Sequence, residues 1–174
     1  MKKVTVQTYL KNKSLAKDKS YEKLAKPFII KARNNLITMN ILSQIEVNQE
    51  AKKLLHVPEN YSSDEWIITT AYYAMYSAAT ALLAKIGYKS GSHNATIAAL
   101  EHFFVKKELI DKEYIEMFKK ALLSKEEIDN ISKAKEEREI AQYRVNESIT
   151  KKTAEDAKKN AYDFVAKAEL LIRD

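Results

Sequence analysis

Two arginines and one amide in a short stretch of the sequence, Arg138, Gln142 and Arg144, are suited to bind a phosphate group. Arg138 and Gln142 are four residues apart and therefore share one face of a helix, with Arg144 close behind them. Guanidinium groups carry a permanent charge and donate hydrogen bonds in a planar fork, as phosphate recognition requires. The alternative is that Arg138 pairs with Glu136, Glu137 or a neighbouring helix, and the spacing alone favours this structural role.

Histidine chemistry is confined to His56, His93 and His102, and the chain has no cysteine. No two histidines are four residues apart, and no Glu-x-x-His pair occurs, so the sequence predicts no metal site and no cofactor. His93 is expected to open a helix, where the positive end of the helix dipole keeps an imidazole neutral. A neutral His93 could serve as a base, although a capping or loop-packing role suits its position better.

Tyrosines cluster in the most apolar part of the chain, residues 64–86, where Tyr72 and Tyr76 are one helical turn apart. Apolar residues at helical spacing indicate packing in the core, with the hydroxyl groups at its edge. The alternative is a groove in which Tyr72 and Tyr76 contact nucleic acid.

The composition predicts one all-α domain. With 45% hydrophobic residues the chain is globular, and two glycines and two prolines are too few for the tight turns of a sandwich, a barrel or repeated βαβ units. The lack of cysteine fits a reducing compartment, and no run approaches 18 consecutive apolar residues. We therefore expect a soluble, cytoplasmic protein that does not span a membrane.

Periodicity and capping signals predict an up-and-down bundle of four to five helices in residues 21–174, preceded by a basic extension at residues 1–20. Three capping boxes, Ser62-x-x-Glu65, Ser124-x-x-Glu127 and Thr153-x-x-Asp156, mark expected helix starts. The expected helices cover residues 27–44, 49–55, 64–86, 93–106, 111–122, 124–140 and 153–174.

Positive charge is concentrated at the start of the chain. Residues 1–35 contain nine lysines and one arginine against Asp18 and Glu22, a net charge of +8, which leaves 6 − 8 = −2 for the remainder. Such a segment attracts phosphate polymers, because neutralising phosphates releases counterions. The alternative is a solvated tail without a ligand.

Three segments in the correct order carry a family resemblance: residues 71–100 (AYYAMYSAATALLAKIGYKSGSHNATIAAL), residues 134–143 (AKEEREIAQY) and, more weakly, residues 31–42 (KARNNLITMNIL). They resemble the tyrosine-rich second helix with its Gly turn and His-containing loop, the signature Arg helix, and the first helix of HEPN-domain proteins. The similarity covers about residues 30–172. It is greatest to the small stand-alone archaeal and bacterial members that are often found with nucleotidyltransferase partners.

The resemblance implies a helical bundle that dimerises so that the signature Arg helices of two chains meet across a cleft. Active members are metal-independent ribonucleases in which an Arg is followed, four to six residues on, by a His that acts in acid/base catalysis. Here Arg138 is followed by Tyr143, no His occurs after His102, and Gln142 stands where many relatives of this group have Asp. A phenol, with an ordinary pKa of about 10, is a poor base at neutral pH.

We therefore expect a homodimeric HEPN-fold protein of a toxin–antitoxin-like system, in which ribonuclease activity is weak or lost. It would bind RNA or a nucleotide through Arg138, Gln142 and Arg144, with Tyr72 and Tyr76. One alternative is an active ribonuclease that uses Arg138 with Tyr143 or His93. The other is a non-enzymatic module that docks a nucleotidyltransferase.

Overall fold

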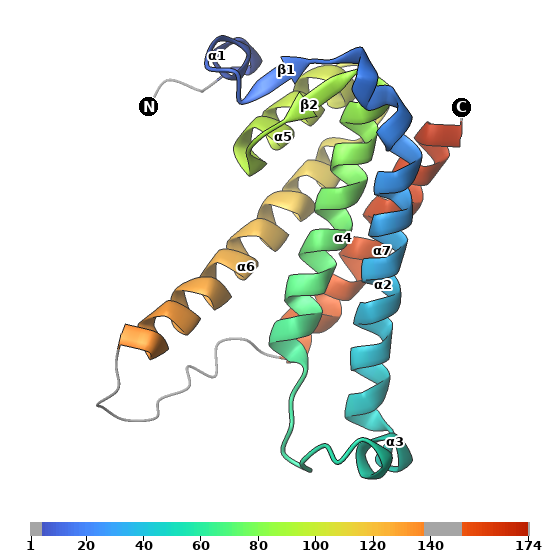
Figure 1. The fold of residues 1–174 in the computed structure, drawn as a ribbon, viewed down its shortest axis with the longest axis vertical. Coiled ribbons are helices and arrows are strands. Elements are labelled where there is room, and N and C mark those ends of the chain that lie inside the picture. The colour runs from blue at the N-terminus through green and yellow to red at the C-terminus, as the bar shows by residue number, and fades with distance from the viewer. Residues whose placement is uncertain (1–4, 138–150, 174) are drawn as a thin grey trace.

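Four long helices form the body of the protein (Figure 1), and they confirm the all-α bundle. The computed structural model describes residues 5–137 and 151–173. Its elements are α1 (Val6–Lys11), β1 (Leu15–Lys17), the 3-10 helix η1 (Lys19–Leu24), α2 (Ala25–Val47), α3 (Gln49–Leu54), α4 (Asp64–Lys85), β2 (Tyr88–Ser90), α5 (His93–Leu100), the π-helix η2 (Glu101–Val105), α6 (Lys112–Glu137) and α7 (Lys151–Arg173). Helices α2, α4 and α7 pack together, whereas α6 leaves the bundle as it runs toward its C-terminal end.

Helix α4 is the central element, and α2, α6 and α7 all pack against it. Its alanines allow these helices to approach closely, and six of them are buried: Ala71, Ala74, Ala78, Ala79, Ala81 and Ala84. By length and composition α4 could also cross a membrane, but 72% of its most apolar window is buried inside the protein. That burial is typical of the core helix of a globular bundle.

The start of α4 differs from the predicted capping box of Ser62 and Glu65. The N-cap residue is Ser63, which is fully buried and makes no side-chain cap hydrogen bond. Its hydroxyl group instead donates to Glu46 Oε2 of α2 at 2.6 Å, while Ser62 Oγ donates to the Asp64 carboxylate at 3.0 Å. The box prediction was wrong because the N-cap is one residue later than predicted: the Ser62 hydroxyl group bonds to the Asp64 carboxylate, and the hydroxyl group of the actual N-cap, Ser63, contacts α2.

Helix α6 is continuous where the sequence predicted a break before residue 124. The box at Ser124 and Glu127 does not open a new helix, because buried Phe118, Leu122 and Ile128 lie on either side of it on one helix. No Gly or Pro interrupts this stretch, so continuing the helix keeps every backbone hydrogen bond. Similarly, α7 begins at Lys151, before the predicted cap at Thr153.

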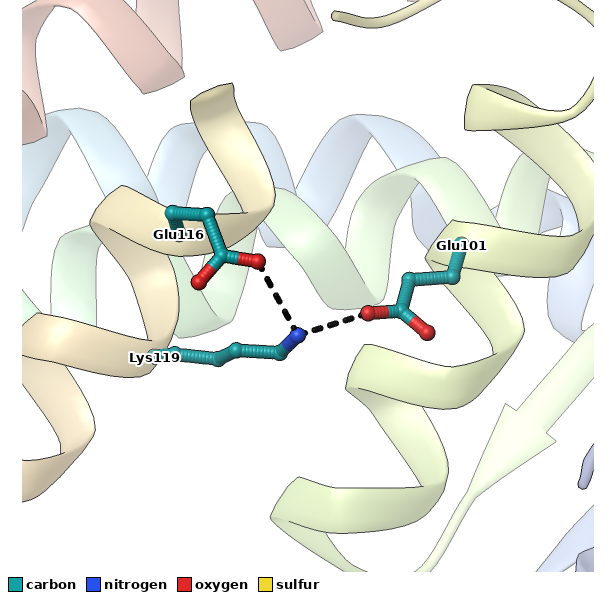
Figure 2. A network of polar contacts seen from close by, with 3 residues as sticks. All are labelled: Glu101, Glu116 and Lys119. Atoms are coloured by element: carbon teal, nitrogen blue, oxygen red, sulfur yellow. Dashed lines mark hydrogen bonds and ion pairs between the residues drawn. The ribbon is translucent and has the colours of Figure 1, made fainter. Parts of the chain in front are cut away.

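The helix predicted at residues 93–106 begins as expected but changes its hydrogen-bonding pattern. Ser92 is the N-cap of α5, and its Oγ accepts a hydrogen bond from the Ala95 N–H at 3.2 Å. From Glu101 the chain continues as the π-helix η2. Figure 2 shows Lys119 of α6 bound to Glu101 Oε1 at 2.7 Å and to Glu116 Oε1 at 3.2 Å, which joins η2 to α6.

The basic N-terminal segment packs on the bundle. Strand β1 pairs antiparallel with β2, with Leu15 opposite Ser90 and Lys17 opposite Tyr88. Val6 and Leu15 are 5% and 1% exposed and belong to the hydrophobic core. The boundary expected at residue 20 remains a prediction, but residues on both sides of it contribute to one core.

Gly87 provides a test of how this segment is held. Its φ of +70° lies in the left-handed region, and an added Cβ would lie 3.1 Å from Glu22 Oε1. We expect Gly87→Ala to lower the free energy of unfolding by about 1–2 kcal/mol in urea denaturation. Gly91→Ala is the matched control, since a Cβ there has ordinary contacts, and it should change stability by less than about 0.5 kcal/mol. Equal effects of the two substitutions would contradict this account.

Candidate functional site

The described part of the predicted site is a cluster of aromatic rings, Tyr72, Tyr76, His93 and Phe118, which we call the His93 cluster. The Tyr72 hydroxyl group is hydrogen-bonded to His93 Nδ1. The His93 ring centroid lies 4.7 Å from that of Tyr76 and 5.5 Å from that of Tyr72. The Phe118 ring stacks on Tyr72 at 6.0 Å.

Three helices position this cluster. Tyr72 and Tyr76 lie one turn apart on α4, and Phe118 comes from α6. His93 is the first residue of α5, directly after the N-cap Ser92. The sequence indicated both tyrosines and His93, but Phe118 only as part of the helix expected at residues 111–122, because the pairing of α6 with α4 is not a local property.

Burial differs sharply between the two tyrosines. Tyr72 is 0% exposed, whereas Tyr76 is partly exposed at the edge of the core. Core packing is therefore the role of Tyr72, and direct contact of Tyr72 with RNA would require the cluster to open. Tyr76 is the tyrosine of this pair that a ligand can reach.

The environment of the cluster favours the uncharged forms of the Tyr72 hydroxyl group and the His93 imidazole. Burial raises the pKa of Tyr72 well above its usual range, and the neighbouring Tyr76, Tyr73 and Glu126 add to this effect. Burial lowers the pKa of His93, and the Lys125 ammonium group lowers it further, against an opposing contribution from Glu126. Burial and the Lys125 charge therefore both favour the neutral form of His93 at pH 7.

Helix α6 brings a cation close to the cluster. Lys125 forms an ion pair with Asp129, and its Nζ lies 5.9 Å from the centroid of the Tyr73 ring. A hydrogen bond from Lys125 to Asp129 raises the pKa of this lysine, so it remains charged. Lys125 was missed in the sequence, where it is one of many lysines on a helix surface.

The predicted phosphate-binding residues Arg138, Gln142, Tyr143 and Arg144 lie outside the described residues. Helix α6 is described as far as Glu137, which is 12 positions after Lys125 and therefore about 18 Å further along the helix at 1.5 Å per residue. The His93 cluster therefore lies several helical turns away from Glu137, the residue before Arg138.

A separate pocket of about 260 Å³ lies between the C-terminal end of α2 and the N-terminal ends of α4 and α7. Its charged lining residues are Glu46, Asp64, Glu155, Lys151 and Lys158. These charges nearly balance, so the pocket does not favour an anion. Among the described residues there is no group of three or more His, Cys, Asp or Glu suited to a metal ion.

Residues 45–171 match the family described as HEPN domain. The chain belongs to the HEPN domain family. The matched region contains α3 to α7, with the whole His93 cluster and the stretch around Arg138. No curated protein and no solved structure matches the chain.

The buried state of His93 predicts a pH dependence of stability. Its pKa is lower in the folded protein than in the unfolded chain, so the unfolded chain takes up the proton first and stability falls as the pH drops below about 6.5. We expect the free energy of unfolding, measured in urea at pH 5 to 8, to decline less steeply toward low pH in His93→Gln than in the wild type. Parallel profiles would show that His93 is not held neutral by the fold.

Proposed function

We propose that this HEPN-domain protein is a cytoplasmic homodimer of a toxin–antitoxin-like system that binds RNA or a nucleotide, with ribonuclease activity weak or lost. One observation carries the proposal: the only histidine of the described site has its Nδ1 hydrogen-bonded to the buried Tyr72. The stretch after Arg138 has Tyr143 and no histidine to replace it. The chain thus keeps a cationic, aromatic binding site while lacking the usual acid/base group.

RNA is the favoured ligand because exposed lysines from distant parts of the sequence lie on segments that pair or follow one another. We define the basic surface as Lys17, Lys19, Lys23 and Lys89, all exposed, from β1, η1 and β2. Pairing of β1 with β2 places Lys89 opposite Ala16, the residue before Lys17, and Lys89 Nζ lies 5.6 Å from the Tyr21 ring centroid.

Asp18 is the acidic group within this surface. A hydrogen bond from Ser20 lowers the pKa of its carboxyl group, and the charges of Lys89 and Lys23 lower it further. The two lysines therefore lie near the same carboxylate, although 66 residues separate them in the sequence. Strand β2 ends at Ser90, and Gly91 and Ser92 connect it to His93, so Lys89 precedes His93 by four residues in the sequence.

RNA binding should depend on the charge of this surface. We expect the affinity for a fluorescein-labelled, mixed-sequence single-stranded RNA to fall steeply with salt in fluorescence anisotropy. Replacing Lys17, Lys19 and Lys23 together by Gln should reduce the slope of log K against log salt by about two, since each phosphate contact contributes about 0.7. This variant keeps the packed backbone of the segment, which a deletion of residues 1–26 would remove.

The control removes the same charge elsewhere, with Lys53, Lys112 and Lys159 replaced by Gln. These lysines are exposed and lie on three different helices, α3, α6 and α7. The control should retain the wild-type slope. Equal slopes for the two triple variants would count against the basic surface as the RNA contact.

Active ribonuclease chemistry is the alternative, supported by the presence of Arg138 in a family whose active members use this arginine. If it operates, cleavage of RNA in the presence of a chelator should be lost in Arg138→Ala, because the guanidinium would no longer stabilise charge on the phosphate. Our proposal predicts binding with little or no Arg138-dependent cleavage, followed by gel electrophoresis. Cleavage at equal rates by both proteins would indicate a contaminating nuclease.

A protein partner is supported by the outer face of α2, where Ile30, Ile37 and Ile41 are 55%, 58% and 52% exposed. Exposed apolar side chains along one helix face are typical of protein–protein contacts. We propose homodimerisation and retain docking of a nucleotidyltransferase as the non-enzymatic alternative. Light scattering on the purified protein distinguishes a dimer from a monomer before any partner is added.

A further inference from the structure

We propose that Tyr72 is a positioning residue that holds His93 in the tautomer with the proton on Nε2, so that His93 offers a neutral N–H donor to a phosphate oxygen of the ligand. That the ligand carries phosphate rests on the proposed function. The assignment of the tautomer depends only on the contacts within the protein. His93 is then a binding residue and not the general base of a nuclease.

The direction of the hydrogen bond follows from the burial of Tyr72. The hydroxyl group is enclosed, stays protonated, and has His93 Nδ1 as its hydrogen-bond partner among the described residues. If Nδ1 carried a proton and donated it to the phenol oxygen, the phenol proton would need a second acceptor. Among the described residues, Tyr72 makes no hydrogen bond to a second acceptor. Tyr72 therefore donates, and Nδ1 accepts.

A neutral imidazole whose Nδ1 accepts must carry its proton on Nε2. The groups that face His93 are Tyr72 and Tyr76 from α4 and Lys125 and Glu126 from α6. The nearby ammonium group of Lys125 disfavours a second proton on the ring, and burial has the same effect. His93 is nevertheless partly exposed, unlike Tyr72, so the nitrogen that is not bonded to Tyr72 is the one available to a ligand.

A hydrogen-bond donor at Nε2 of His93, close to the Lys125 ammonium group, is suited to bind an anion. The Nε2–H group and the Lys125 ammonium group come from α5 and α6, which contact each other, and the Lys125 charge acts on His93. A neutral N–H beside a cation can hold a phosphate oxygen without adding a charge that burial would oppose. As a base the ring would need an unprotonated Nε2, which the hydrogen bond from Tyr72 excludes.

The tautomer is measured directly by two-dimensional ¹H–¹⁵N correlation of the imidazole nitrogens in the full chain at pH 7. We expect Nε2 of His93 to be protonated and Nδ1 unprotonated in the wild type. Tyr72→Phe removes the donor, so the two nitrogens should move toward a mixture of tautomers and the pKa of His93 should rise. Tyr76→Phe keeps the neighbouring ring and should leave the wild-type pattern unchanged. A protonated Nδ1 in the wild type, or no change in Tyr72→Phe, would overturn the assignment.

The ligand contact is tested by anisotropy with the same labelled RNA, using variants whose folding is checked by circular dichroism. The amide of Gln can replace an Nε2–H donor, whereas the shorter amide of Asn occupies the Nδ1 position. We expect His93→Gln to bind within about twofold of the wild type, and His93→Asn and His93→Ala to bind about tenfold more weakly.

These outcomes separate the two proposals. Equal losses in Gln, Asn and Ala variants would overturn the donor role of Nε2. A wild type that does not bind RNA would overturn the proposed function and the phosphate contact together, while the nitrogen spectra would still decide whether Tyr72 sets the tautomer of His93.

Discussion

The fold depends on one constraint: α4 is apolar around most of its circumference and must be enclosed on nearly every side. Its small residues let α2 and α7 approach closely, and α6 covers part of the remaining surface near Tyr72 and Tyr76. Charges reinforce the enclosure at the helix ends. Lys85 of α4 donates to the carbonyl oxygen of Leu171 at 2.8 Å, and Arg33 of α2 binds Glu169 of α7.

The same enclosure creates the His93 cluster. A fully buried tyrosine in the middle of a largely buried helix has a hydroxyl group that cannot reach water, and leaving it unpaired would be costly. The start of α5 supplies the acceptor, His93 Nδ1. Packing of the core and chemistry of the site are therefore coupled, because the side chain that fills the core also determines what the histidine can do.

The N-terminal segment links this site to the charge of the chain. Its described lysines are exposed, while Val6 and Leu15 are buried, and the backbone is held by β2 and by Gly87, whose carbonyl oxygen accepts from the Asp18 N–H at 2.7 Å. A segment that has the composition of a loose tail thus presents its positive charge on a rigid surface. Within that surface, Lys89 precedes His93 by four residues in the sequence, and both lie in the region that matches the HEPN domain family.

The sequence by itself determined the helical class, the central place of α4 and the apolar face of α7, where Ala154, Ala161 and Phe164 are buried as their spacing predicts. The spacing of hydrophobic residues and the composition are properties of the sequence itself, so they can be determined without knowing which segments pack together. Only the tertiary structure decided where the hydroxyl group of Ser63 goes, that α6 continues through Ser124, and that Tyr72 binds His93. These outcomes depend on which helix lies alongside, and contacts between helices distant in the chain override local capping signals because burial and hydrogen bonding together contribute more free energy than one cap.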